Sequence, residues 1–449
     1  MKLTKLLKSA VKAFTIALCL VLADVAAAAP VVADQAASMP PAPNTAMANI
    51  ECDTLDIYEM CTASNMQASH KVRMLILSDT HAGDLKDVPF PKADVVLHCG
   101  DLTNDSRSAE FEKSLAVLRT IDAPLKLVIP GNHDYSLEQG YWEGKSAKSL
   151  ADSRQQEGNS RDLHSRTANV EPLENNVESD EDTRTSWDLI HRAARDDNIF
   201  LLPQGLHALA IPTRSGPARL RLFASPMTRR CGTWAFQYDR SIPYRWGIPP
   251  MTTDGDPVVD VVMTHGPSLG IRDGTGMRRT GDKRPGAGCA ALLSAVERAR
   301  PRLHCFGHIH EAWGAETITW RREVYASGQD WGSDAPTCGN LVDARESRVL
   351  ASLLPFNDSW TTGQDTLESP PPARDQEPPR MDGGCCTLDI SLDGEHAIKP
   401  GVQTLCVNAA IGLRPAPWRG MPWLVEMDLP SAGEEDASAA TETKCRQLS

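Results

Sequence analysis

The sequence lacks the cysteine spacings and the basic segments that mark several common protein classes. Its 12 cysteines include no C-x-x-C pair and no zinc-finger spacing, which argues against a cysteine-held structural zinc site. A long Lys/Arg block is also absent, and 59 acidic residues outnumber 46 basic ones, for a net charge of -13. An acidic chain of this kind is a poor candidate for nucleic-acid binding, so we expect no nucleic-acid partner.

The N-terminal apolar run is too short for a typical membrane-spanning helix. It covers residues 14–23, with four lysines before it and small residues after it, which is the layout of a secretory signal. We interpret residues 1–29 as a signal-like or anchor segment, the only part of the chain expected to contact a membrane. The protein is then secreted or N-terminally anchored; the alternative is a cytoplasmic protein with an amphipathic, alanine-rich tail.

Polar segments interrupt an otherwise regular pattern. Residues 30–70 are rich in alanine, proline and small polar residues and are interpreted as a linker. Residues 137–183 have almost no large apolar side chains, and residues 362–384 are rich in proline, so both are predicted to be disordered insertions. The folded domain is therefore expected over residues 71–430, and a polar tail over residues 431–449.

Between these segments, short apolar runs alternate with amphipathic ones, which is typical of an α/β fold. Phe111, Leu115 and Leu118 are spaced to share one helix face, as are Leu292, Val296 and Ala299. Helices are predicted over residues 108–121, 186–195 and 289–301. Strands are predicted within residues 72–77, 93–101, 125–134, 206–212, 218–226, 256–267, 302–310, 323–328 and 404–411, with a final edge strand over 423–430.

Five of the predicted strands end in residues that bind metals or turn the chain. The segments are "SDTH" (Asp79, His81), "HCGD" (Asp101), "PGNHD" (Asn132, His133), "MTHG" (His265) and "FGHIH" (His308, His310). Sites in α/β folds form at the carboxyl ends of strands, so one shared site is expected. Histidine, aspartate and asparagine without cysteine suit Mn, Fe or Zn. Seven of these eight side chains as ligands are too many for one ion and suit two ions about 3.5–4 Å apart.

These blocks, D-x-H, G-D, G-N-H-D, T-H-G and G-H-x-H, resemble in kind and order those of the calcineurin-like metallophosphoesterases. Segments such as "ASPMTRRCGTWAFQY" and "GCAALLSAVERARPRLHCFGHIHEAWG" look like the metallophosphoesterase-domain-containing branch found in fungi and animals. The resemblance implies an α/β fold, a β-sandwich of two mixed sheets flanked by helices. It also implies a metal-dependent hydrolase acting on a small phosphoester, a phosphodiester or a nucleotide.

The resemblance also divides the seven candidate ligands between two ions. Asp101 would bridge both ions, and three further side chains would hold the first (Asp79, His81 and His310) and three the second (Asn132, His265 and His308). A hydroxide bridging the ions would attack phosphorus. His133 would not be a ligand but would stabilise or protonate the leaving oxygen. The chain departs from many members at Asn104, where they carry an acidic residue.

Two other classes of function stay open from the sequence. Residues 266–270, "GPSLG", match the G-x-S-x-G motif of serine esterases, with Ser268 as nucleophile, although Pro267 precedes it and no helical pattern follows. A non-catalytic scaffold protein that retains the fold is the other, but such a protein should have lost ligands. A substrate pocket is one interpretation of the segment that contains Trp234, Phe236 and Arg229. The other is that the two aromatic side chains belong to the core and that the arginine is solvated.

Overall fold

The computed structural model describes residues 68–85, 87–138, 176–241, 244–275, 286–321, 341–353, 380–382, 384–412 and 420–433. The expected leader, most of the expected linker and most of both expected insertions lie outside the described residues. So do the strand predicted at 323–328 and nearly all of the expected polar tail. Among the described helices, none is both long and apolar enough to cross a membrane.

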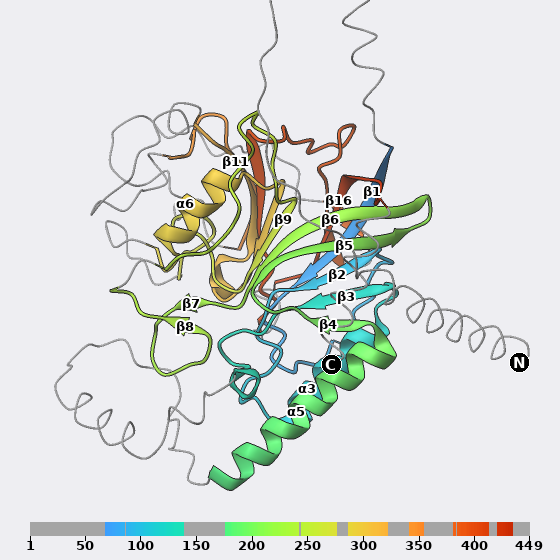
Figure 1. Cartoon of the computed structure of the whole chain (residues 1–449), viewed down its shortest axis with the longest axis vertical. Coiled ribbons are helices and arrows are strands. Elements are labelled where there is room, and N and C mark those ends of the chain that lie inside the picture. The colour runs from blue at the N-terminus through green and yellow to red at the C-terminus, as the bar shows by residue number, and fades with distance from the viewer. Residues whose placement is uncertain are drawn as a thin grey trace, which may run out of the picture. The chain divides into compact units, whose positions relative to one another are not determined.

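Two seven-stranded mixed sheets pack against each other at the centre of the fold (Figure 1). The first has the spatial order β13 (Arg380–Asp382), β14 (Cys385–Asp389), β16 (Trp423–Pro430), β1 (Ser69–Leu77), β2 (Val95–His98), β3 (Leu125–Val128) and β4 (Ile199–Leu201). The second has the order β12 (Arg348–Ser352), β11 (Gly314–Thr319), β15 (Gln403–Asn408), β10 (Leu303–Phe306), β9 (Val261–Thr264), β6 (Gly216–Ser225) and β5 (Gly205–Thr213). The expected sandwich of two mixed sheets is confirmed.

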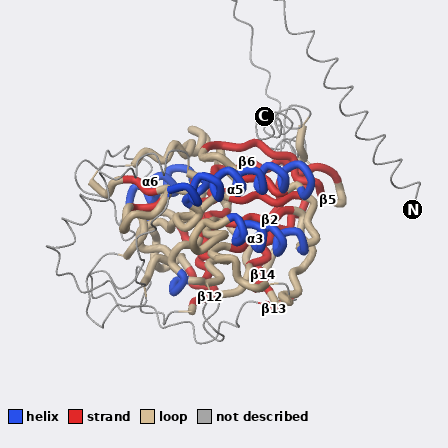
Figure 2. The backbone as a smooth tube through the Cα atoms, turned by 90° about the horizontal axis from the view of Figure 1, so that it is seen from below, coloured by secondary structure: helices blue, strands red, loops and turns tan. Residues whose placement is uncertain are grey.

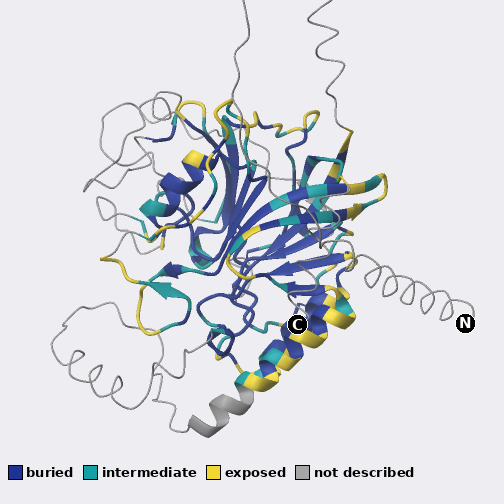
Figure 3. Ribbon diagram, in the orientation of Figure 1, coloured by how far each residue is buried: buried dark blue, intermediate teal, exposed yellow. Residues whose placement is uncertain are grey.

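Helices cover the outer faces of the sandwich (Figure 2). α3 (Ser108–Thr120) and α5 (Asn176–Asp197) share an apolar cluster with the first sheet, and α6 (Ala290–Ala299) shares one with the second. The residues predicted to form the inner faces of α3 and α6 are all buried: Phe111, Leu115, Leu118, Leu292, Val296 and Ala299. Figure 3 shows the complementary exposed side of α5, which faces away from the sheet. Short 3-10 turns, η1 (Tyr135–Leu137) and η3 (His310–Ala312), and a small β7 (Thr228–Arg229)–β8 (Gln237–Tyr238) pair complete the described elements.

Several elements differ from the sequence prediction. α5 begins at Asn176 rather than at residue 186, so residues 176–183 of the first expected insertion are helical, and β13 falls within the second. The prediction that residues 423–430 form an edge strand is wrong, because β16 pairs with β1 on one side and with β14 on the other. Glu426 of β16 pairs with Arg73 of β1 across the sheet's outer face (3.2 Å).

His304 on β10 is fully buried. Thr264 Oγ1 donates to the Gly266 carbonyl (2.7 Å) and so accepts from His304 Nε2 (3.0 Å), while Nδ1 has no partner within the described residues. Burial lowers the pKa of His304 to about 3. The unfolded chain, with a pKa of about 6.5, binds the proton more readily, so His304 lowers the stability of the fold as the pH falls from about 6.5 towards 3.

The variant His304→Gln keeps a donor near the position of Nε2 but does not titrate. We expect its free energy of unfolding to depend less on pH between 6 and 4, by up to about 1.4 kcal/mol per pH unit. Urea denaturation at several pH values measures this, with His191→Gln on the exposed face of α5 as the matched control. Equal pH slopes for the two variants would show that His304 does not carry the acid sensitivity.

Candidate metal centre

The seven predicted ligands all lie on loops that follow strands of the two sheets. β1, β2 and β3 are parallel neighbours in the first sheet, and β9 and β10 are parallel neighbours in the second. Their carboxyl ends therefore meet at one end of the sandwich, as expected. The structure brings the predicted ligands into two groups there: Asp79, His81 and His310 in one, and Asp101, His265 and His308 in the other, with Asn132 beside His265.

The first group is held by short contacts between side chains from both sheets. His310 Nε2 lies 3.1 Å from Asp79 Oδ1 and 3.3 Å from His81 Nε2. Asp79 is fully buried, and its carboxylate accepts two hydrogen bonds from the His308 backbone N–H (2.9 and 3.1 Å). The segment "GHIH" is thereby fixed to the end of β1, so His310 faces His81.

Asp101, a member of the second group, also faces the first. Its Oδ2 is 3.7 Å from His81 Nε2 in the first group, and its Oδ1 is 3.4 Å from His265 Nε2 in the second. His265 Nε2 is also 3.0 Å from Asn132 Oδ1. A carboxylate that presents one oxygen to each group has the geometry of a bridging ligand.

The donor set fits metal ions. His81 Nδ1 donates to the Thr103 carbonyl (2.9 Å) and His265 Nδ1 to the Cys99 carbonyl (2.8 Å). Each ring then turns the lone pair of Nε2 into the cluster, which is how backbone carbonyls orient ligating histidines. In the second group, two acceptor oxygens, Asp101 Oδ1 and Asn132 Oδ1, converge on His265 Nε2, an arrangement that a positive charge stabilises. A divalent cation would supply one.

The pKa values of Asp101 and His308 suit metal binding, whereas His265 must lose a proton before it can bind an ion. Burial raises the pKa of Asp101, but His265 and His81 outweigh it and hold that pKa well below its usual range. Burial also lowers the pKa of His308 to about 4, so its imidazole is neutral at physiological pH. Burial lowers the pKa of His265, yet the Asp101 carboxylate raises it to about 9. Ionised aspartates beside a neutral His308 are the protonation states that metal binding needs.

Four of the ligands sit in strained backbone. Asp79, His81, Asp101 and His308 all have positive φ angles, between 46° and 69°. Such a conformation costs about 1–3 kcal/mol for a non-glycine residue, and strain of this kind concentrates at functional sites. Gly307 makes room for it, since a Cβ there would occupy the space of the Asp79 carboxylate.

Asp134 and Asn408 support the ligand loops, and the sequence prediction missed both roles. The buried Asp134 carboxylate accepts from the backbone N–H groups of Gly131 (2.8 Å), Leu102 (3.1 Å) and Thr103 (3.0 Å), and from Thr103 Oγ1 (2.7 Å). It therefore ties the "GNHD" turn to the loop that carries Asp101.

Asn408 supports the other ligand loop. Its Nδ2 donates to the Ile309 carbonyl (3.0 Å), between the two histidines of "GHIH". The available signals were the final Asp of "GNHD" and a lone Asn in the apolar run "LCVNAAI".

His133 lies beside the two groups and belongs to neither. Its backbone N–H donates to Asp101 Oδ1 (2.8 Å), and its ring Nδ1 donates to the Asn104 carbonyl (2.7 Å). The ring meets His81 edge-on, with centroids 4.9 Å apart, and lies against Trp234 at 4.2 Å. Because Nδ1 is engaged, Nε2 is the ring atom available for proton exchange. Asn104 also donates from Nδ2 to the His81 carbonyl (2.9 Å), so this departure from the family pattern still supports the site.

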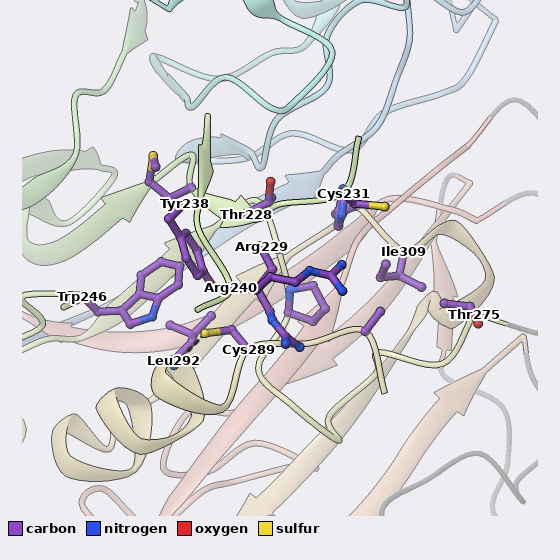
Figure 4. A pocket seen from close by; sticks show the side chains of 15 residues that line it. Thr228, Arg229, Cys231, Tyr238, Arg240, Trp246, Thr275, Cys289, Leu292 and Ile309 are labelled. Carbon is purple, nitrogen blue, oxygen red and sulfur yellow. Dashed lines mark hydrogen bonds between the residues drawn. The ribbon is translucent and has the colours of Figure 1, made fainter. Parts of the chain in front are cut away.

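A cavity of about 170 Å³ adjoins the centre at His308 (Figure 4). Of the three residues considered for a substrate pocket, only Arg229 lines it. Trp234 lies against His133 instead, and Phe236 packs against the apolar cluster beneath α3 and α5.

Ser268 does not have the surroundings of a serine nucleophile. It is fully buried, its Oγ has no hydrogen-bond partner within the described residues, and no helix follows it in residues 269–275. A serine esterase needs an exposed hydroxyl beside a base, so the geometry argues against this alternative.

The amino-acid sequence is similar to those of known proteins and to one protein-family model. The model of the calcineurin-like phosphoesterase family matches residues 72–312. The chain is 28% identical over 245 residues to metallophosphoesterase domain-containing protein 1 of Homo sapiens and of Mus musculus, over 54% of this chain and 61% of each relative. It is also 28% identical over 251 residues to the probable rhamnogalacturonate lyase C of Emericella nidulans, over 56% of this chain and 18% of that protein. The similarity thus spans less than two thirds of the length of each of these relatives.

Proposed function

Because the chain belongs to the calcineurin-like phosphoesterase family, we propose that it hydrolyses a phosphodiester or a nucleotide with the help of two divalent metal ions. The observation that carries the proposal is the position of Asp101, whose two carboxylate oxygens face the two ligand groups. A mononuclear site would not need a buried carboxylate shared in this way. All seven ligand positions are filled, so nothing favours a non-catalytic scaffold.

The proposed roles of the ligands follow from their positions. Asp79, His81 and His310 would hold one ion, Asn132, His265 and His308 the other, and Asp101 both. When bound, two such ions lower the pKa of a shared water from about 15.7 towards about 7 and neutralise charge on the phosphoryl oxygens. The carbonyls of Thr103 and Cys99 keep the rings of His81 and His265 oriented for this task.

His133 is proposed as the acid that protonates the leaving oxygen. The hydrogen bond from Nδ1 to the Asn104 carbonyl fixes the ring and leaves Nε2 to deliver a proton. Trp234 covers one face of the ring. His133 is half-buried, so its ring can exchange protons with solvent between turnovers.

Metal removal tests the proposal. Prolonged incubation with excess chelator should abolish hydrolysis of bis(p-nitrophenyl) phosphate, because every proposed step depends on bound ions, and Mn²⁺ should restore it. A panel of monoesters, linear diesters and cyclic diesters on the Mn²⁺-loaded protein would then define the preferred ester. Full activity in excess chelator, lost on Ser268→Ala, would instead support the serine esterase.

A further inference from the structure

The cavity beside His308 carries two cationic side chains and no described acidic one. It lies between the β7–β8 segment and the loop that precedes α6, and Figure 4 shows Arg229 and Arg240 near its centre, with Tyr238 and Trp246 to one side. No aspartate or glutamate is among the described residues that line it. The whole chain has a net charge of -13, so a cavity lined by two arginines and by no described carboxylate differs in charge from the rest of the protein.

The two arginines keep donors available for a ligand. Arg229 is half-buried, and its Nη1 donates to the Gly288 carbonyl (2.8 Å), which anchors the side chain but leaves the other N–H groups of the guanidinium unused by that bond. Arg240 is exposed and makes no ion pair within the described residues. One anchored and one exposed guanidinium on the same cavity suit a planar or tetrahedral oxyanion.

The aromatic wall adds a further donor. Trp246 Nε1 is buried and lacks a hydrogen-bond partner within the described residues, while the Tyr238 hydroxyl lies beside the Cys289 thiol. Tyr244 stacks on Tyr238 with ring centroids 4.4 Å apart and meets Trp246 edge-on at 5.1 Å, which holds this wall in place. The wall thus adds the indole N–H of Trp246 to the donors of the two guanidinium groups.

We propose that this cavity binds a second phosphate group of the substrate, so that the substrate is a phosphoester carrying two phosphates. The inference rests on the proposed function, because it assumes that the first phosphate lies at the metal centre. Two guanidinium groups match the charge of about −1.5 to −2 on a phosphate monoester better than that of a carboxylate. The volume of about 170 Å³ is small beside the roughly 300–1,000 Å³ of sites for whole ligands, so it suits one group of the substrate.

Binding of two matched ligands tests this. Titration calorimetry of the Mn²⁺-reconstituted protein should show thymidine 3′,5′-bisphosphate binding at least about 10-fold more tightly than thymidine 5′-phosphate, the range expected for charge-assisted hydrogen bonds. Arg240→Gln should reduce that preference by about 10-fold, and Arg229→Gln should do the same. Arg230→Gln is the matched control, since Arg230 is exposed, adjacent in sequence and absent from the lining.

Equal binding of the two ligands by the unmodified protein would overturn the proposal, as would an equal loss of preference in Arg230→Gln and Arg240→Gln. Hydrolysis of bis(p-nitrophenyl) phosphate, which has one phosphate, judges the proposed function separately. If the protein hydrolyses bis(p-nitrophenyl) phosphate but binds the two thymidine ligands equally, the proposed function is supported and the second-phosphate site is ruled out. If it prefers the bisphosphate but does not hydrolyse bis(p-nitrophenyl) phosphate, the anion site is supported and the phosphoesterase function is ruled out.

Discussion

Replacement of Asp101 by asparagine is expected to abolish hydrolysis of bis(p-nitrophenyl) phosphate. The amide keeps the size of the side chain but removes the negative charge that both ligand groups share. We expect a loss of activity larger than the roughly 10²–10³-fold that removal of one electrostatic donor costs. Steady-state rates at saturating Mn²⁺ measure it.

Asp105→Asn is the control for this variant, because Asp105 lies on the same loop but is exposed. It should retain nearly full activity. Both proteins should show the same far-UV circular dichroism, since the backbone N–H of His133 can still donate to the remaining amide oxygen at position 101. Activity of Asp101→Asn within a few fold of the unmodified protein would rule out Asp101 as the shared ligand.

Replacement of His133 by alanine is expected to slow the reaction according to the leaving group. A dinucleoside phosphate, whose leaving alkoxide needs a proton, should lose roughly the 10²–10⁴-fold typical of a positioned general acid. Bis(p-nitrophenyl) phosphate should lose much less, because nitrophenolate departs without a proton. The ratio of the two rates, measured for both proteins, gives the effect without reference to protein concentration.

His191→Ala, on the exposed face of α5, should change neither rate and serves as the control for His133→Ala. An equal loss on both substrates would assign His133 to positioning, through its contacts with Asp101 and Trp234, rather than to proton transfer.

The ligands could be predicted from the sequence because each follows a short apolar strand directly. A buried parallel strand is recognisable from its composition, and parallel order brings successive strand ends to one place whatever the loops do. The convergence of Asp79 with Asp101 in the first sheet, and of His265 with His308 in the second, thus follows from parallel order within each sheet. The inner faces of α3 and α6 could be predicted from another local signal, the helical spacing of their apolar residues.

The features that the sequence did not predict depend on contacts between segments that are far apart in the chain. Asp134 looks like part of a turn in the sequence, and only the fold shows that its carboxylate reaches the backbone of Leu102 and Thr103. The place of β16 inside a sheet depends on pairing with β14 and β1, segments far from it in the chain. The cavity is likewise formed by residues from separate loops, such as Arg229, Cys289 and His308.

The metal content of the protein tests the central claim most directly. Mass spectrometry of Mn²⁺-saturated and desalted protein is expected to find two ions per chain. His308→Ala, which removes one ligand from the second group, should lower the count towards one, whereas His133→Ala should leave it at two. One ion or fewer per unmodified chain, or two ions retained by His308→Ala, would contradict a binuclear centre built from these ligands.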